Sequence, residues 1–230
     1  MVSFHRVHAV IFDVDGTLYS QGRLRRIMAL QLLGYFSLRP WRLRELATLQ
    51  LFRRHREHLA DTDATEIGRR QYAEVATRVG CSESFVREVV NYWIERQPLP
   101  HLERCRNLGV VETFAALQDT GRKIAVLSDY PVKEKLHALG LRVDVAVAAT
   151  DLGVDRLKPN PTGLLQTITE LGLSKENCLF VGDRDERDGV CARALGVDYL
   201  LYSKNCGPGR FTDFHWLANQ LRSTPLTSSS

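Results

Sequence analysis

Two aspartates stand two positions apart directly after a short apolar segment near the start of the chain. Residues 8–12 are rich in strand-forming side chains, and the motif Asp13-Val14-Asp15-Gly16-Thr17 follows them. Because the chain turns where a strand ends, both carboxylates can reach a site at the carboxyl end of a sheet, where ligands bind in open α/β folds. Gly16 permits an unusual backbone angle and a close approach of the main chain to a ligand. The motif therefore predicts a ligand-binding site at this strand end.

Complementary side chains follow later apolar segments. Ser128 comes directly after one of them and offers a hydroxyl, with nearby backbone N–H groups, to phosphate oxygens. Lys158 brings a positive charge, and Asp183 and Asp188 follow the apolar residues 178–181. Mg²⁺ prefers hard oxygen ligands, keeps several waters and binds carboxylates together with substrate phosphate. Four carboxylates, one lysine and one serine at separate strand ends therefore predict a site for Mg²⁺ and a phosphate group.

The elements that must position these residues alternate along the chain. Strand-like apolar segments recur at residues 8–12, 123–127, 143–148, 178–181 and 199–202, with helical patterns at 111–118, 132–139, 162–171 and 189–195. Alternation of strand and helix at this spacing is typical of a parallel sheet covered on both faces. The predicted fold class is α/β, with a Rossmann-like parallel sheet core and helices on both of its faces.

Residues 20–100 interrupt this alternation. They contain no convincing strand and are dense in Leu, Arg, Glu and Ala at helical spacing, and Pro40 is expected to separate two helices. The region predicts an inserted α-helical cap of about four helices. The predicted organisation is a core at residues 1–19 and 101–222, a cap at 20–100 joined at 20–22 and 97–100, and a disordered tail at 223–230.

Composition limits the class of protein. Hydrophobic residues make up 44% of the 230 residues and charged residues 25%, as in ordinary soluble globular proteins. No apolar stretch reaches about 18 residues, so neither a transmembrane helix nor stable membrane insertion is expected. The start of the chain has no apolar signal segment, which favours a cytoplasmic location. The five cysteines include no Cys-x-x-Cys, so free thiols are expected in place of disulfides or a zinc site.

Positive charge is concentrated in the predicted cap. Residues 20–106 hold sixteen Arg and no Lys against ten acidic residues, a net charge of +6. Cap arginines can bind a carboxylate or second phosphate of a substrate, and the candidates nearest in sequence to the first strand are Arg23, Arg25 and Arg26. The same basic segment, with Trp41, could instead bind a membrane surface or nucleic acid. The aliphatic residues are needed to hold the insert together, so no nucleic-acid partner is expected.

The motifs resemble those of the haloacid dehalogenase (HAD) superfamily of phosphatases. The matching residues appear in family order: Asp13 to Thr17, then Ser128, then Lys158-Pro159, then Gly182-Asp183 with Asp188. The resemblance covers about residues 7–22 and 99–202, and the helical insert looks like the cap that this family carries after its first strand. Four motifs in order at compatible spacing make a chance match improbable.

The resemblance implies roles for these residues. Asp13 would be the nucleophile that forms an aspartyl-phosphate, and Asp15 the general acid and then the base that activates water. An isolated Asp has a pKa of ~3.9, so this role predicts a raised pKa for Asp15. Ser128 and Lys158 would bind the transferring phosphoryl group. Mg²⁺ would be held by a carboxylate oxygen of Asp13, the backbone carbonyl of Asp15, Asp183 and, directly or through water, Asp188, with Asp185 or Glu186 as alternatives to Asp188.

Several residues differ from those that related phosphatases commonly carry, or have roles that the motifs leave open. Asp129 follows Ser128 where related phosphatases often carry Asn or Gly, and we group it with the phosphate-side residues. Its negative charge predicts a side chain that points away from the phosphate or meets the cap. Asn160 stands where Asp is frequent. Thr17 is expected to orient Asp15 or to cap a turn. These departures bear on the substrate and leave the reaction class unchanged.

The resemblance also favours some reactions of the superfamily over others. A dehalogenase of this family lacks the second acid of the first motif, so Asp15 argues against it. The related phosphonoacetaldehyde hydrolases use a cap lysine, and this cap has none. The predicted function is a Mg²⁺-dependent, phosphoglycolate phosphatase-like phosphomonoesterase acting on a small phosphorylated metabolite, such as phosphoglycolate or a sugar phosphate. A β-phosphoglucomutase-like sugar phosphomutase is the alternative, and the sequence carries no signal for oligomeric state.

Overall fold

Six parallel strands form one sheet in the order β3-β2-β1-β4-β5-β6 in the computed structural model, which describes residues 2–226. The strands are β1 (Ala9–Phe12), β2 (Lys123–Ser128), β3 (Val145–Ala148), β4 (Cys178–Gly182), β5 (Asp198–Tyr202) and β6 (Arg210–Phe211). The central strand β1 is in register with both neighbours, since Ala9 pairs with Lys123 of β2 and with Cys178 of β4. The strand order reverses beside β1, and ligands bind outside the carboxyl ends at such a reversal. The predicted parallel α/β fold is confirmed.

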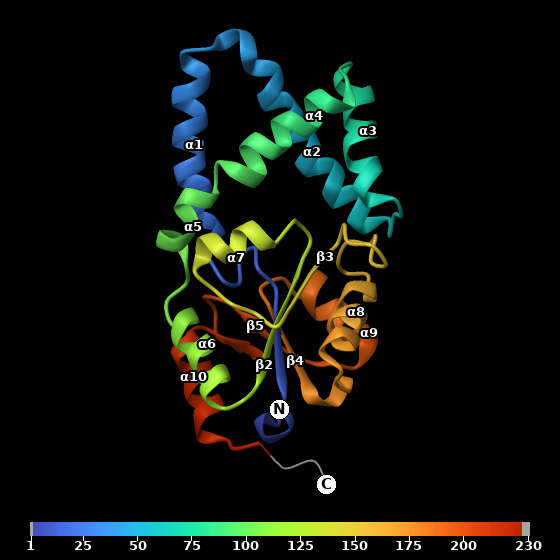
Figure 1. The fold of residues 1–230 in the computed structure, drawn as a ribbon. Coiled ribbons are helices and arrows are strands. Elements are labelled where there is room, and N and C mark those ends of the chain that lie inside the picture. Colours follow the sequence, from blue (N-terminus) through green and yellow to red (C-terminus); the bar gives the residue numbers. More distant parts are fainter. Residues whose placement is uncertain (1, 227–230) are drawn as a thin grey trace.

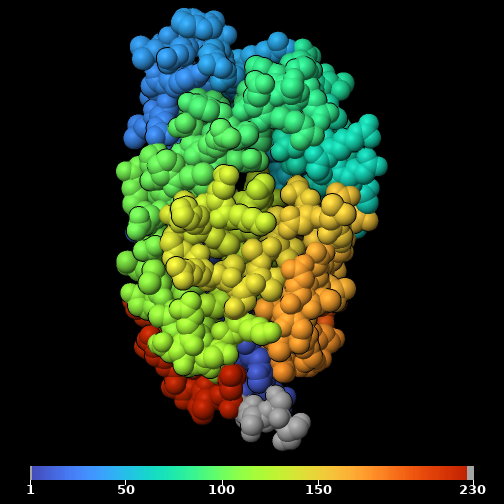
Figure 2. Space-filling model, in the orientation of Figure 1, coloured from blue at the N-terminus to red at the C-terminus, as the bar shows by residue number. Residues whose placement is uncertain are grey.

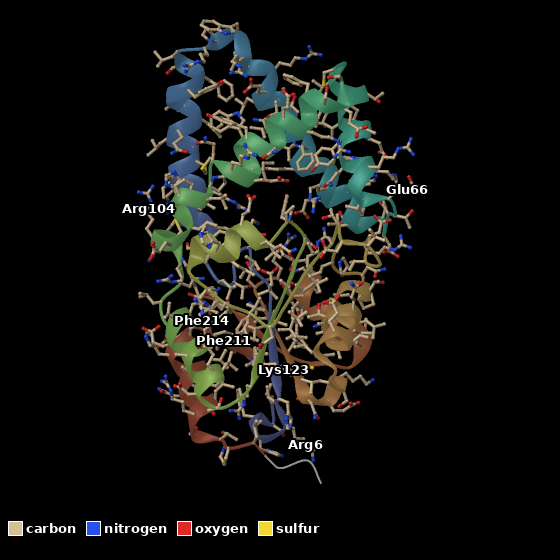
Figure 3. The ribbon with its side chains drawn as sticks, viewed as in Figure 1. Arg6, Glu66, Arg104, Lys123, Phe211 and Phe214 are labelled. Carbon is tan, nitrogen blue, oxygen red and sulfur yellow. The ribbon has the colours of Figure 1, made fainter. Side chains whose placement is uncertain are left out.

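Helices cover both faces of the sheet (Figure 1). Helices α6 (Val110–Asp119) and α10 (Phe214–Ser223) lie on one face, and α8 (Thr162–Leu171) and α9 (Val190–Leu195) lie on the other. Alternate residues of β1 point to opposite faces, so Phe12 joins the first core and Ile11 the second. On the first face the rings of Phe211 and Phe214, labelled in Figure 3, pack edge to face with centroids 5.0 Å apart.

Two elements near the end of the chain were not among those expected. The short strand β6 and helix α10 follow β5, and α10 buries Phe214, Leu217, Ala218 and Leu221. The expected disordered tail started at Ser223, which is the last residue of α10, and residues 227–230 lie outside the described part of the chain. Short 3-10 or π turns complete the core at Phe4–Arg6, Lys175–Asn177 and Asp185–Gly189.

A layer of helices stands over the carboxyl edge of the sheet (Figure 1). Its members are α1 (Gln21–Ser37), α2 (Leu43–Asp61), α3 (Ile67–Val79), α4 (Glu83–Val90) and α5 (Leu99–Cys105), with short turns at Pro40–Arg42 and Asn91–Arg96. Two of them begin at a capping serine: the hydroxyl of Ser20 accepts from the N–H of Arg23 at 3.3 Å, and that of Ser82 from the N–H of Phe85 at 3.2 Å. We call this layer the cap.

The cap joins the core through two paired connections. The N–H of Ser20 donates to the carbonyl of Cys105 at 2.8 Å, and that of Asn107 donates to the carbonyl of Leu18 at 3.0 Å. The second junction therefore lies at residues 105–107, beyond the 97–100 expected from the sequence, because α5 runs across that boundary. The first connection follows the first motif directly, and the second is tied to it by these two hydrogen bonds and by the bridge between Tyr19 and Arg106.

The cap also rests on the core at a second place, which we call the docking contact. There Leu59, Ala64 and Ile67 of the cap bury their side chains against Ala149 and Leu157 of the core. Figure 2 shows the atoms of the cap seated directly on those of the core. Among residues 2–226, no helix is long and apolar enough to cross a membrane.

Candidate active site

The end of β1 brings the first acidic pair to the carboxyl edge of the sheet. The N–H of Asp13 donates to the carbonyl of Val181 at 2.8 Å, which continues the pairing of β1 with β4. Gly16 has a φ of 112°, and a Cβ at this position would lie 2.2 Å from a carboxylate oxygen of Asp183. Only glycine fits here, because the backbone angle and the close approach both exclude a side chain.

Asp13 is buried and held by two donors. The ammonium of Lys158, also buried, donates to Oδ1 of Asp13 in a short hydrogen bond and to Oδ1 of Asp188 at 2.7 Å. The hydroxyl of Thr17 donates to Oδ2 of Asp13 at 3.1 Å. The expectation that Thr17 orients Asp15 is therefore wrong, because its hydroxyl, four residues on from Asp13, donates to the carboxylate of Asp13.

Three carboxylates form a group suited to a metal ion. One oxygen each from Asp13, Asp183 and Asp188 lies within 4.8 Å of the others. Burial raises the pKa of Asp13 well above its usual range; Lys158 opposes this effect, and Asp188 adds to it. Burial and the neighbouring Asp188 likewise raise the pKa of Asp183 to about 6. A divalent cation would relieve this crowding of negative charge, so the residues present fit Mg²⁺.

The structure distinguishes Asp188 from the two nearby acids. Its Oδ2 accepts from the N–H groups of Asp183 and Arg184 at 3.1 and 3.0 Å. By contrast, Asp185 binds Arg193 at 2.7 Å and Glu186 binds Arg184 at 2.8 Å, both on the exposed side of the loop. Asp188, and not Asp185 or Glu186, therefore lies with Asp13 and Asp183.

The residues after β2 lie on the other side of Asp13. Ser128 is buried, its hydroxyl lies 3.4 Å from Oδ2 of Asp15, and it accepts from the N–H of Tyr130 at 3.2 Å. The carboxylate of Asp129 accepts from the N–H of Lys158 at 3.1 Å, and its carbonyl accepts from Arg56 of the cap. Asp129 thus supports the lysine loop with its side chain and meets the cap with its backbone, and it lines the cavity.

Asp15 has partners that the sequence reasoning missed. The ammonium of Lys135 lies 2.6 and 2.7 Å from its two carboxylate oxygens, and the hydroxyl of Tyr19 donates to it in a short hydrogen bond. The side-chain amide of Gln21 donates to its backbone carbonyl at 2.8 Å. Asp15 is not a member of the three-carboxylate group.

The expected rise in the pKa of Asp15 is wrong. Burial acts to raise the pKa, but the charge and hydrogen bonds of Lys135 and the hydrogen bond from Tyr19 outweigh it, so the pKa is lowered. A signal for Lys135 was present in the sequence. With Val132, Leu136 and Leu139 it occupies the buried face around α7 (Lys133–Leu139), where a lysine needs a partner.

A cavity of about 620 Å³ lies between the cap and these core residues. Its walls include apolar side chains of the cap, among them Leu24, Met28 and Trp93, and cap arginines. Of the three arginines expected to contact substrate, Arg25 lines the cavity, whereas Arg23 and Arg26 are exposed and are not part of its lining. On α1 only every third or fourth residue faces inward, which separates Arg25 from the other two.

The fold and the site together define an α/β enzyme. A family model described as haloacid dehalogenase-like hydrolase matches residues 7–196, so the chain belongs to that family, as the motifs predicted. A glyceraldehyde 3-phosphate phosphatase of Methanopyrus kandleri is 28% identical over 206 residues, covering 83% of this chain and 82% of the relative. The pyrophosphatase PpaX of Halalkalibacterium halodurans is 37% identical over 95 residues, covering 39% of this chain and 42% of the relative.

A solved structure supports the fold. The crystal structure of a HAD phosphatase from Thermococcus onnurineus has a TM-score of 0.62 and 21% identity, covering 96% of this chain and 100% of that one. The likeness spans the cap as well as the sheet, because nearly the whole of each chain is covered. At this level of identity it speaks for the fold alone, and the chemistry rests on the site.

Proposed function

We propose that this hydrolase is a Mg²⁺-dependent phosphatase that hydrolyses small phosphomonoesters through an aspartyl-phosphate on Asp13. One observation carries the proposal: the buried ammonium of Lys158 lies between Asp13 and Asp188, beside the three-carboxylate group and at the floor of the cavity. An anionic nucleophile approaching an anionic phosphate is repelled, and fixed positive charge at that point offsets the repulsion. Bound Mg²⁺, held by Asp13, Asp183 and Asp188, would supply further neutralising charge to the phosphoryl oxygens.

The first step transfers the phosphoryl group to the protein. A carboxylate oxygen of Asp13 attacks phosphorus, the phosphorus–oxygen bond to the leaving group breaks, and the leaving alkoxide takes a proton from Asp15. Thr17 and Lys158 hold the two oxygens of Asp13 and so fix the direction of attack. In the second step Asp15 takes a proton from water, which attacks the same phosphorus and releases inorganic phosphate and free Asp13.

Asp15 needs a proton for the first step, although its pKa is lowered in the ligand-free protein. A phosphate dianion that enters beside Asp15 favours the protonated carboxyl, because a nearby like charge disfavours ionisation. Substrate phosphate also competes with Asp15 for the ammonium of Lys135. Substrate binding would therefore prepare the general acid.

The curated relatives support the reaction class. Both are named as phosphatases, one of glyceraldehyde 3-phosphate and one of pyrophosphate. We propose a small phosphorylated metabolite as the substrate and the cap as the element that closes over it and excludes water. Phosphoglycolate and sugar phosphates are the first compounds to try.

The test is phosphate release from p-nitrophenyl phosphate and a panel of phosphomonoesters, with and without Mg²⁺. Wild type should turn over only with Mg²⁺, and Asp13→Asn should lose activity by about a thousandfold or more. Asp185→Asn is the matched control, because Asp185 lies in the same loop as Asp188 but pairs with Arg193 on the surface. It should keep wild-type turnover.

Two results would count against the proposal. Undiminished turnover by Asp13→Asn would remove Asp13 as nucleophile. Conversion of a sugar 1-phosphate to the 6-phosphate, without free phosphate, would establish the phosphomutase instead.

A further inference from the structure

Most charges that line the cavity are already paired within the protein. Lys135 pairs with Asp15, and Lys158 pairs with Asp13 and Asp188. On the cap side, Glu57 of α2 accepts from Arg184 at 3.2 Å and from Arg187 at 2.8 Å. Arg184 also pairs with Glu186 and Arg187 with Asp61, so these two core arginines hold three carboxylates between them.

Among the described residues, two arginines of the cavity wall have neither a hydrogen-bond partner nor an ion-pair partner. Arg53 and Arg54 of α2 line the cavity and are exposed to solvent, and neither side chain makes a hydrogen bond or ion pair with any of residues 2–226. Arg53 shares one face of α2 with Arg56, Glu57 and Ala60, which all line the cavity at helical spacing. Glu57 pairs with Arg184 and Arg187 and makes no ion pair with Arg53 or Arg54.

The remaining wall offers a place for a carbon skeleton. Leu24 and Met28 of α1 and Trp93 line the cavity between its charged parts. The volume of about 620 Å³ lies within the range of pockets that enclose a whole small-molecule ligand and exceeds what a phosphate group alone needs. The cavity thus has the buried ammonium of Lys158 on its core side, an apolar wall, and the two unpaired arginines Arg53 and Arg54 on α2.

We propose that the substrate carries a second anionic group, a carboxylate or a second phosphate, which Arg53 and Arg54 bind while its ester phosphate lies at Asp13. This inference rests on the proposed phosphatase function and names the substrate class of the same site. Arginine is suited to the role, because its planar guanidinium matches carboxylate and phosphate oxygens in pairs. A phosphomonoester with a neutral remainder would leave both arginines without a partner.

The experiment compares kcat/KM for esters that differ in the second group. Glycerol 3-phosphate is the neutral member, phosphoglycolate carries a carboxylate, and fructose 1,6-bisphosphate carries a second phosphate. The variant combines Arg53→Gln with Arg54→Gln. The matched control combines Arg23→Gln with Arg26→Gln, which removes the same charge from the cap at two exposed positions outside the cavity lining.

The expected result is a preference of about tenfold or more for at least one doubly anionic ester over glycerol 3-phosphate, lost in the Arg53/Arg54 variant and kept in the control. Which ester is preferred separates the carboxylate from the phosphate. Equal kcat/KM for all three esters, or a preference that survives in the Arg53/Arg54 variant, would overturn the inference. A preference lost equally in the control would overturn it too, since general cap charge would then explain it.

Failure of the proposed function looks different. Mg²⁺-dependent hydrolysis of p-nitrophenyl phosphate that Asp13→Asn abolishes would leave the function standing even when the selectivity is absent.

Discussion

At the scale of single residues, side chains from separate strands meet at one edge of the sheet. Asp13, Ser128, Asp183 and Asp188 each lie at or just beyond the end of a strand, and parallel strands bring their carboxyl ends together. Their meeting could therefore be predicted from the order of elements. Lys135 lies 120 positions from Asp15. Their ion pair depends on the direction in which α7 leaves β2, which no local pattern states.

Lys135 provides the first prediction at this scale. Lys135→Met should lower kcat/KM for p-nitrophenyl phosphate by about tenfold or more, because Asp15 loses the ammonium that fixes its carboxylate. Lys135→Arg, which keeps the charge, should recover part of the loss. Steady-state kinetics with saturating Mg²⁺ measures both.

The control for Lys135 is Lys133→Met, two residues earlier on the exposed side of the same helix. It should leave the kinetics unchanged. Wild-type kinetics in Lys135→Met would show that Tyr19 alone suffices to hold Asp15.

At the scale of elements, the docking contact joins the start of α3 to the loop between β3 and α8. The carboxylate of Asp155 accepts from the N–H groups of Glu66 and Ile67 at 2.6 and 2.8 Å. A residue of the core therefore satisfies N–H groups at the N-terminus of α3, a helix of the cap. Asp155 and Glu66 both have positive φ, 43° and 56°. Non-glycine residues hold such angles only where surrounding contacts fix them. The docking contact is therefore a specific joint between cap and core.

Removing that carboxylate should loosen the cap. Asp155→Asn keeps a side chain that tolerates the left-handed conformation and retains only one good acceptor. We expect faster amide hydrogen exchange at residues 63–70 and a cost of about 1 kcal/mol to the docked state. Hydrogen exchange read by mass spectrometry provides the measurement.

Asp151→Asn is the control for the docking contact, because the carboxylate of Asp151 accepts from Ala148 within the core. Its exchange at residues 63–70 should match wild type. Equal exchange in Asp155→Asn and wild type would show that the apolar part of the contact, around Ile67, holds the cap alone.

Elements also differ in how well their patterns announce them. Strand β1 follows from the short apolar segment of strand-forming residues before Asp13. Helix α10 is not among the predicted helices, although Phe214, Leu217 and Leu221 recur at helical spacing after the N-cap residue Asp213. Strand β6 has only two residues, too few for any periodicity.

At the scale of the whole molecule, the three-carboxylate group that fits Mg²⁺ also lowers the stability of the folded protein. Burial and Asp188 raise the pKa of Asp183 to about 6, so the folded protein holds a proton that the unfolded chain, near 3.8, has lost. Between these values the folded state binds more protons, and its stability must fall as pH rises. Above about pH 6 the full cost is present in the metal-free protein. Bound Mg²⁺ would remove it by pairing with the ionised carboxylate.

The last prediction follows from this loss of stability with rising pH. Asp183→Asn should stabilise the metal-free protein at pH 7.5, by on the order of 2 kcal/mol, since it removes a buried charge that the fold disfavours. The gain over wild type should shrink toward pH 4.5, where wild-type Asp183 is already protonated. Thermal unfolding of both proteins in a chelator, at the two pH values, measures the difference. Added Mg²⁺ should raise the Tm of wild type and not of Asp183→Asn, whereas equal shifts in the two proteins would place the ion elsewhere.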